Sequence, residues 1–301
     1  MSVWRELWGV HKVVAAKKCA FHRRHSHFLT STDGTGERCV LPICAMPKQQ
    51  HSPLFILSHM RSYSSVLSHV LGSHLQIDGY CETHLRYRFS FDLLRLKWRV
   101  RKLTGEPLRG RYVLDKILHN YPVSTAILEN PRTRAIILLR QPVDVVQSIV
   151  HMGRHLDTND RNANVAIATA YYVERLSQLA RLAQVFGRRA AFLESESLTT
   201  RTDEALDFLS EFLELDSPLE RRYRSFSKTG KPGYGDPSEM IHSGEIESRT
   251  SERPKYSIPA ELVAKAVQAY ADCFSACALH CVPVSATRRE DAQDGTLQLA
   301  M

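Results

Sequence analysis

Short apolar runs alternate with longer segments in which apolar residues recur every three to four positions between residues 53 and 282. Such runs are typical of buried strands, and that recurrence is typical of helices packed on one face. Strands are predicted at the start of the stretch 53–71 and at 111–116, 134–140 and 190–193. Helices are predicted at the end of the stretch 53–71 and at 84–103, 122–129, 142–152, 163–186, 197–213 and 259–281. This alternation predicts an α/β fold with a doubly wound, mostly parallel sheet flanked by helices.

The stretch 53–71 combines an apolar strand, a short polar turn and an amphipathic helix. The start of a helix offers unpaired N–H groups and a positive dipole end to an anion. In the turn, Arg61 and the hydroxyls of Ser62, Ser64 and Ser65 are candidates to complete an anion site. The alternative is an ordinary strand–turn–helix unit with a serine N-cap.

Two further cations follow predicted strands. Lys116 ends the run 111–116, and Arg140 ends 134–140, the most apolar run of the chain, which predicts a central strand covered on both faces. Ligands of open α/β sheets bind at the carboxyl ends of the strands. Arg61, Lys116 and Arg140 therefore predict one pocket for sulfate or phosphate groups, the alternative being unrelated surface cations.

The turn after the first strand lacks the pattern G-x-x-x-x-G-K-[ST] of nucleotide-triphosphate loops. The strand ends also show no aspartate clearly suited to magnesium. These features argue against kinases and GTPases, and we expect the anion to be bound without a metal.

The composition is that of a soluble globular protein, with 43% hydrophobic and 24% charged residues. No run approaches the roughly 18 uncharged apolar residues of a membrane span, so none is expected. Of the net charge of +8, residues 1–30 carry +5, which weakens the case for a nucleic-acid partner of the domain. We predict a poorly ordered basic extension over 1–50, a domain over 51–285 and a flexible tail over 286–301.

Seven cysteines are scattered without C-x-x-C pairs, which favours a reducing compartment and a cytoplasmic location. Cys273, Cys277 and Cys281 recur every four residues in the last predicted helix. This spacing either aligns metal ligands or, as is far more common, marks a helix face packed on the core.

Several motifs resemble one family. The turn R-S-Y-S-S (61–65), the pairing of L-G-S-H (71–74) with G-Y-C-E-T-H (79–84), the stretch 137–148 and the loop K-T-G-K-P-G-Y-G-D-P-S from Lys228 occur in order. Over about residues 53–282 the chain resembles the sulfotransferases that use 3′-phosphoadenosine 5′-phosphosulfate (PAPS), in their bacterial-type or tyrosylprotein-sulfotransferase-like branch. The resemblance implies a P-loop-like fold, a PAPS co-substrate and no metal.

The resemblance also implies roles for individual residues. Residues 61–65, Tyr63 among them, correspond to the 5′-phosphosulfate loop, and Arg140 with Ser148 corresponds to the 3′-phosphate site. Lys116 would stabilise the leaving phosphate together with Arg61. The loop that covers the nucleotide would contribute Gly230, Lys231, Gly233 and Gly235.

Removal of the acceptor's hydroxyl proton requires a general base. Glu82 stands where related enzymes carry a catalytic glutamate, and the alternative is a cap for the helix predicted from His84. His119 is the rival base, because cytosolic family members carry a histidine near this lysine, although the spacing here is Lys116-x-x-His119.

Tyr63 stands where the family loop usually has glycine. If that position needs a positive φ, tyrosine is an unfavourable occupant. A catalytically weak nucleotide-binding or interaction protein is therefore the second hypothesis, and a nucleotide-dependent kinase is the third. A small molecule, a carbohydrate hydroxyl and a peptide are all compatible acceptors, and a homodimer is compatible with the sequence.

Overall fold

The computed structural model describes residues 51–156, 160–231, 233–236, 239–247 and 255–284. The extension predicted over 1–50 and the tail predicted over 286–301 lie outside the described residues. The predicted domain, 51–285, contains all the elements considered below.

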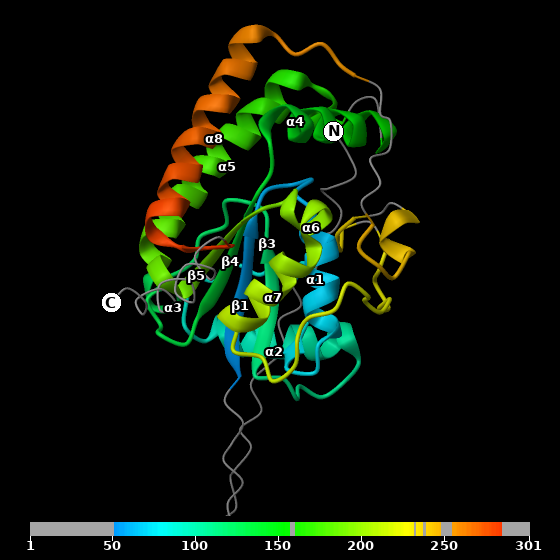
Figure 1. Cartoon of the computed structure of the whole chain (residues 1–301), viewed down its shortest axis with the longest axis vertical. Coiled ribbons are helices and arrows are strands. Elements are labelled where there is room, and N and C mark those ends of the chain that lie inside the picture. The colour runs from blue at the N-terminus through cyan, green and yellow to red at the C-terminus, as the bar shows by residue number, and fades with distance from the viewer. Residues whose placement is uncertain (1–50, 157–159, 232, 237–238, 248–254, 285–301) are drawn as a thin grey trace, which may run out of the picture. The chain divides into compact units, whose positions relative to one another are not determined.

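A six-stranded sheet with the order β2-β3-β1-β4-β5-β6 forms the centre of the fold (Figure 1). Every neighbouring pair is parallel, so the predicted α/β fold with a mostly parallel sheet is confirmed. The strands are β1 (Ser52–Ser58), β2 (Ile77–Asp78), β3 (Tyr112–Ile117), β4 (Arg134–Leu139), β5 (Ala190–Glu194) and β6 (Val282–Pro283). The strand order changes direction between β1 and β4, where ligands of open α/β sheets bind.

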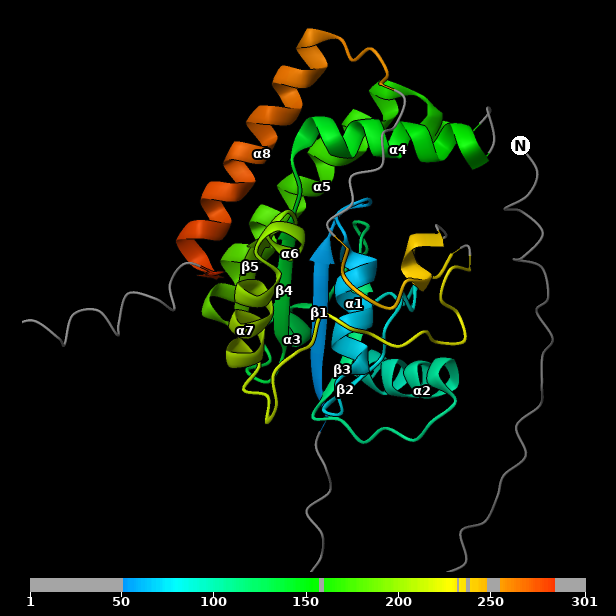
Figure 2. The ribbon, with the colours of Figure 1, turned by 45° about the vertical axis from the view of Figure 1, so that its right-hand side comes forward.

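Helices cover both faces of the sheet (Figure 2). They are α1 (Ser64–Ser73), α2 (Asp92–Thr104), α3 (Thr125–Leu128), α4 (Pro142–Leu156), α5 (Val165–Phe186), α6 (Ser197–Thr200), α7 (Thr202–Phe212) and α8 (Ala260–His280). Short 3₁₀ turns are η1 (Arg161–Ala163), η2 (Gly187–Arg189) and η3 (Glu239–His242).

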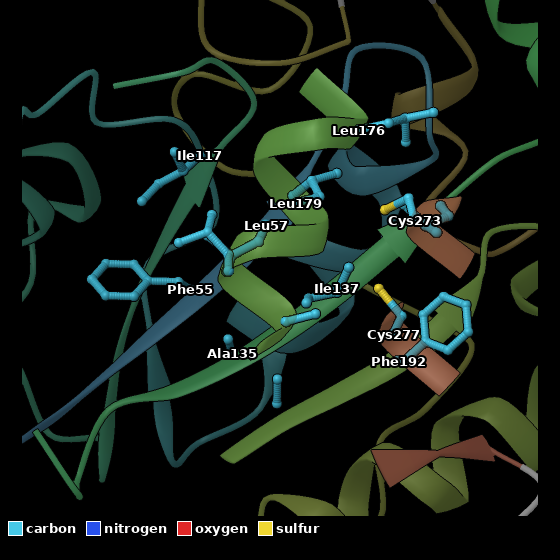
Figure 3. Packing of buried hydrophobic residues seen from close by; sticks show 14 of the residues in the cluster. Phe55, Leu57, Ile117, Ala135, Ile137, Leu176, Leu179, Phe192, Cys273 and Cys277 are labelled. Carbon is cyan, nitrogen blue, oxygen red and sulfur yellow. The ribbon is translucent and has the colours of Figure 1, made fainter. Parts of the chain in front are cut away.

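Successive residues of β1 enter two separate cores because side chains alternate across a strand. Phe55 and Leu57 join a core with α5 and α8 (Figure 3), whereas Leu54 and Ile56 join a core with α1 and α7. Both faces of the central strands are thus apolar, which explains why the sequence of β4 shows no alternation.

The cysteines of α8 belong to the first core (Figure 3). Cys273, Cys277 and the following Cys281 are all buried. Within the described part of the chain, no group of three or more His, Cys, Asp or Glu residues is placed to hold a metal ion. Core packing therefore explains the four-residue spacing.

Several helix predictions are wrong in their bounds, as for the helix predicted over 142–152, which extends to Leu156. The helix predicted from residue 84 begins at Asp92, because the buried Asp115 carboxylate accepts hydrogen bonds from Thr83 and Tyr87 and fixes the chain in a non-helical course. The helix predicted over 197–213 is interrupted at Arg201, whose backbone is not helical. The two-residue edge strands β2 and β6 were not predicted, since they are too short to show a pattern.

Among the described helices, α8 alone is long and apolar enough to cross a membrane when judged by length and composition. This is weak evidence, because core helices of soluble proteins pass the same criterion. One face of α8 packs on the first core through its cysteines.

Candidate active site

A cavity of about 320 Å³ lies at the carboxyl ends of the central strands. The turn after β1, the segment after β2, the end of β4 and the glycine-rich segment before η3 contribute to its wall. The predicted site residues in this wall are Arg61, Ser62, Tyr63, Ser64, Ser65, Glu82, His119, Arg140, Gly233 and Gly235. The parallel topology thus brings most of the predicted residues together.

The turn after β1 has an unusual backbone. Arg61 (φ 63°) and Tyr63 (φ 60°) both adopt left-handed conformations, which non-glycine residues rarely do. Ser62 between them is fully buried: its hydroxyl donates to the His59 carbonyl at 2.8 Å, and its own carbonyl accepts from Ser195 Oγ at 2.8 Å. The turn is therefore fixed from within, with the Arg61 and Tyr63 side chains in the cavity wall.

Lys116 lies beneath the cavity wall, with a side chain only 1% exposed. Its Nζ donates to Ser65 Oγ at 2.9 Å and lies 3.4 Å from Glu82 Oε1. The predicted base and the predicted charge stabiliser thus form a buried ion pair at the start of α1. The alternatives of a solvent-exposed lysine and an exposed helix cap are wrong for Lys116 and Glu82.

A second carboxylate, that of Asp115, connects the two segments that carry this pair. Asp115 accepts hydrogen bonds from the backbone N–H of Thr83 and from that of Lys116, each at 2.8 Å. Burial raises the pKa of Asp115 to about 6. Asp115 therefore joins the segment that carries Glu82 to the strand that carries Lys116.

Arg61 is already engaged by protein groups. Its Nε donates to Ser148 Oγ at 2.9 Å, and its Nη1 lies 3.2 Å from Asp236 Oδ1. The Asp236 backbone N–H also donates to Ser65 Oγ at 2.9 Å. Ser148, predicted beside Arg140, thus contacts Arg61 and is itself buried.

Arg140 lies on the other side of the turn. Its guanidinium stacks on the Tyr63 ring at 4.6 Å, and its Nη1 donates to the Arg61 carbonyl at 2.9 Å. The carboxylates of Glu196 and Asp144 lie 3.7 Å and 4.0 Å from its nitrogens, at the limit of ion pairing. Arg140 therefore lines the cavity with no carboxylate of the described residues at hydrogen-bonding distance.

Both base candidates line the cavity. Glu82 belongs to the buried pair, whereas His119 is half-buried near the ring of Tyr171. Burial lowers the pKa of His119, so the imidazole is neutral near pH 7. The geometry leaves either residue able to accept a proton, and the contact with Lys116 distinguishes Glu82.

Only some glycines of the segment that begins at Lys228 line the cavity. Gly235 (φ 141°) lies so close to the buried pair that an added Cβ would be 3.0 Å from Ser65 Oγ and 3.3 Å from Lys116 Nζ. Gly233 also lines the cavity, and its carbonyl lies 2.6 Å from His84 Nε2. Gly230 instead packs on the His242 ring, and Lys231 is exposed, so neither is in the cavity wall.

Sequence reasoning missed several residues that fix the site. Arg175, 1% exposed, donates to the carbonyls of Ser58, Ile117 and His119 and so binds the ends of β1 and β3. The sequence did give one signal, because this arginine stands among the regularly spaced apolar residues of α5. Asp236 and His84 gave no distinct signal in the sequence.

His59 was also missed. Its Nε2 accepts the backbone N–H of Arg140 at 3.1 Å, so its Nδ1 carries the proton and donates to the Met60 carbonyl at 2.9 Å. Burial lowers the pKa of His59 to about 3. A neutral histidine therefore joins the end of β1 to the start of the Arg140 loop.

Comparison with solved structures identifies the fold. The chain is similar to the "Sulfotransferase Domain from the Curacin Biosynthetic Pathway", with 18% identity, a TM-score of 0.50 and coverage of 73% of this chain and 97% of that one. It is also similar to the "Sulfotransferase Domain from the Synechococcus PCC 7002 Olefin Synthase", with 18% identity, a TM-score of 0.51 and coverage of 76% and 97%. No protein-family model and no curated protein sequence matches the chain. At this identity the likeness establishes the fold, which is that of sulfotransferase domains.

Proposed function

We propose that the protein is a PAPS-dependent sulfotransferase that transfers the sulfuryl group to a hydroxyl acceptor. The observation that carries this proposal is the Lys116–Glu82 pair beneath a cavity that Arg61 and Arg140 also line. A cation beside a candidate base, next to two further cations, suits transfer of an anionic group to a hydroxyl. The fold of sulfotransferase domains gives this chemistry precedence over other anion transfers.

The donor's two anionic ends match the two sides of the turn after β1. In this proposal the phosphosulfate lies at the start of α1, where Lys116 contacts Ser65 and Arg61 lines the cavity. The 3′-phosphate lies by Arg140, whose planar guanidinium suits bidentate contacts with phosphate oxygens. The glycine-rich segment, through Gly233 and Gly235, covers the phosphosulfate end.

In the proposed reaction the acceptor hydroxyl attacks the sulfur in line with the leaving oxygen. The bond between the acceptor oxygen and sulfur forms, and the bond between sulfur and the phosphate oxygen breaks, leaving adenosine 3′,5′-bisphosphate. Glu82 accepts the hydroxyl proton, and Lys116 offsets the charge that develops on the leaving phosphate. His119 is the rival base on the same cavity wall.

One contact favours a second candidate, a nucleotide-binding protein with weak catalysis. The Asp236 carboxylate lies 3.2 Å from Arg61, so a bound phosphosulfate would have to displace it or share the arginine with it. The left-handed backbone at Tyr63 also favours this second candidate, because tyrosine takes this conformation only with strain and a glycine would not.

Transfer from PAPS distinguishes these candidates. Purified protein is incubated in EDTA with PAPS and a panel of phenol, sugar and peptide hydroxyls, and sulfated product is measured together with adenosine 3′,5′-bisphosphate. The proposal expects equimolar formation of the two products with at least one acceptor class. Binding of adenosine 3′,5′-bisphosphate without transfer to any acceptor would favour the second candidate. Magnesium-dependent binding of ATP in place of the bisphosphate would favour a kinase.

A further inference from the structure

The turn after β1 contains two residues with left-handed backbone, and both contact the same side chain. Arg61 and Tyr63 are two of four non-glycine residues with positive φ in the described part of the chain. Backbone of this kind persists only where the surroundings hold it, and such residues gather at functional sites. The contacts of these two residues therefore indicate what the turn does.

Both residues contact Arg140. The Arg61 carbonyl accepts from Arg140 Nη1 at 2.9 Å, and the Tyr63 ring lies under the guanidinium at 4.6 Å. The Arg140 backbone is fixed as well: its N–H donates to His59 Nε2, and its carbonyl accepts from the Tyr172 hydroxyl at 2.6 Å. The guanidinium is thus held on one face by a ring and at one edge by a carbonyl.

Another edge of the Arg140 guanidinium faces the Glu196 carboxylate without a hydrogen bond. Its Nε is buried and makes no hydrogen bond with the described residues. The nearest carboxylate oxygen, Glu196 Oε1, is 3.7 Å from Nε, too far for a hydrogen bond. Both Glu196 oxygens are likewise buried without a hydrogen bond, so this edge is paired only loosely. A planar guanidinium that is held by a ring, lines the cavity and has carboxylates only at 3.7 Å and 4.0 Å is suited to an anionic oxygen.

We infer that Tyr63 is a positioning residue that holds the Arg140 guanidinium for a second phosphate and so sets a preference for nucleotides that carry one on the ribose 3′-oxygen. The inference rests on the proposed function and assigns part of its donor specificity to the ring in the turn. Tyr63 is the residue that the sequence marked as the least favourable for donor binding. In the structure its ring contributes to the site.

Packing alone is the competing explanation, because Tyr63 also lies against the apolar core shared with α1 and α7. A packing role would lower stability when the ring is removed and would leave nucleotide preference unchanged. The experiment therefore compares ligands that differ only in the 3′-phosphate.

Wild type and the variants Tyr63→Phe, Tyr63→Leu and Tyr63→Gly are titrated by calorimetry in EDTA with adenosine 3′,5′-bisphosphate and with adenosine 5′-monophosphate. Tyr63→Phe keeps the ring and should bind both within two-fold of wild type. Tyr63→Leu should bind the bisphosphate about ten-fold more weakly while its monophosphate affinity changes less than two-fold. Tyr63→Gly should lose the same preference, while its thermal midpoint should fall less than that of Tyr63→Leu, since glycine takes this backbone without strain.

Trp98→Leu is the matched control, because it removes an aromatic ring stacked on Lys102 at 5.3 Å outside the cavity wall. It should leave both affinities unchanged. Full retention of the bisphosphate preference in Tyr63→Leu would overturn the inference while leaving the proposed function standing. Failure of wild type to bind the bisphosphate would overturn the proposed function and this inference with it.

Discussion

The two sides of the turn after β1 present positive charge in different ways. Lys116 is buried, and its Nζ contacts both the Glu82 carboxylate and the Ser65 hydroxyl. Arg140 is partly exposed, rests on the Tyr63 ring and has carboxylates only at 3.7 Å and 4.0 Å. The buried cation is paired inside the protein, whereas the partly exposed cation lines the cavity without a carboxylate at hydrogen-bonding distance among the described residues. Replacement of Lys116 should therefore affect stability and turnover together, and replacement of Arg140 should affect binding alone.

Replacement of Lys116 should have the largest effect. Lys116→Met leaves the Glu82 carboxylate buried without its cation, which should lower the free energy of unfolding by about 3 kcal/mol. It also removes charge stabilisation at the leaving phosphate, so turnover should fall about 1,000-fold. Urea denaturation and initial rates of sulfation measure the two effects, with the exposed Lys102→Met as control. A variant as stable as wild type would show that the buried pair does not contribute to the fold.

Replacement of Glu82 should separate chemistry from binding. Glu82→Gln keeps the shape of the side chain but cannot accept the acceptor's proton, so kcat should fall about 100-fold. Affinity for adenosine 3′,5′-bisphosphate should stay within two-fold, because Lys116 retains Ser65. His119→Gln is the paired variant and should lose much less turnover. Unchanged turnover in Glu82→Gln, with a loss in His119→Gln, would assign the base to His119.

Replacement of Arg140 should affect the donor alone. Arg140→Ala removes charged hydrogen bonds to the 3′-phosphate and should raise the donor KM about 50-fold with kcat within three-fold. Arg154→Ala, which removes an arginine stacked on Tyr256 at 4.3 Å outside the cavity wall, should leave both constants unchanged. A fall in kcat without a rise in KM would contradict the distinction between the two sides.

The smallest effect should come from His59, which supports the Arg140 side through the backbone. The pKa of His59 is about 3 in the folded protein and near 6.5 in the unfolded chain. The unfolded state therefore binds the extra proton between these values, so this contribution is complete above pH 6.5 and is lost as the pH falls towards 3. His59→Gln removes the titration and should flatten the fall in unfolding free energy between pH 7 and pH 5, as urea denaturation would show. The same pH dependence in wild type and variant would argue against this role.

Local sequence patterns were sufficient to predict much of the fold. The strand, turn and helix within 53–71 and the central strand ending at Arg140 have the patterns that their burial requires. The meeting of Arg61, Lys116 and Arg140 near one cavity was predictable because parallel strands end at the same edge of a sheet.

Contacts between distant segments were not predictable from those patterns. Asp236 on Arg61 joins residues 175 positions apart, and the His59 contact with the Arg140 backbone depends on the register of β1 and β4. The late start of α2 has the same origin, since Asp115 of β3 holds the preceding segment. The ring of Tyr63 is the clearest case: the sequence marked an unfavourable residue, and only the position of Arg140 showed what it contacts.

The central claim is that the cavity between Arg61 and Arg140 holds a nucleotide by two separate anionic ends. Calorimetric titration of the wild-type protein in EDTA, with adenosine 3′,5′-bisphosphate and adenosine 5′-monophosphate in parallel, tests it most directly. The account predicts one site per chain and an affinity for the bisphosphate at least ten-fold higher than for the monophosphate. Equal affinities for the two nucleotides, or no binding of either, would contradict it.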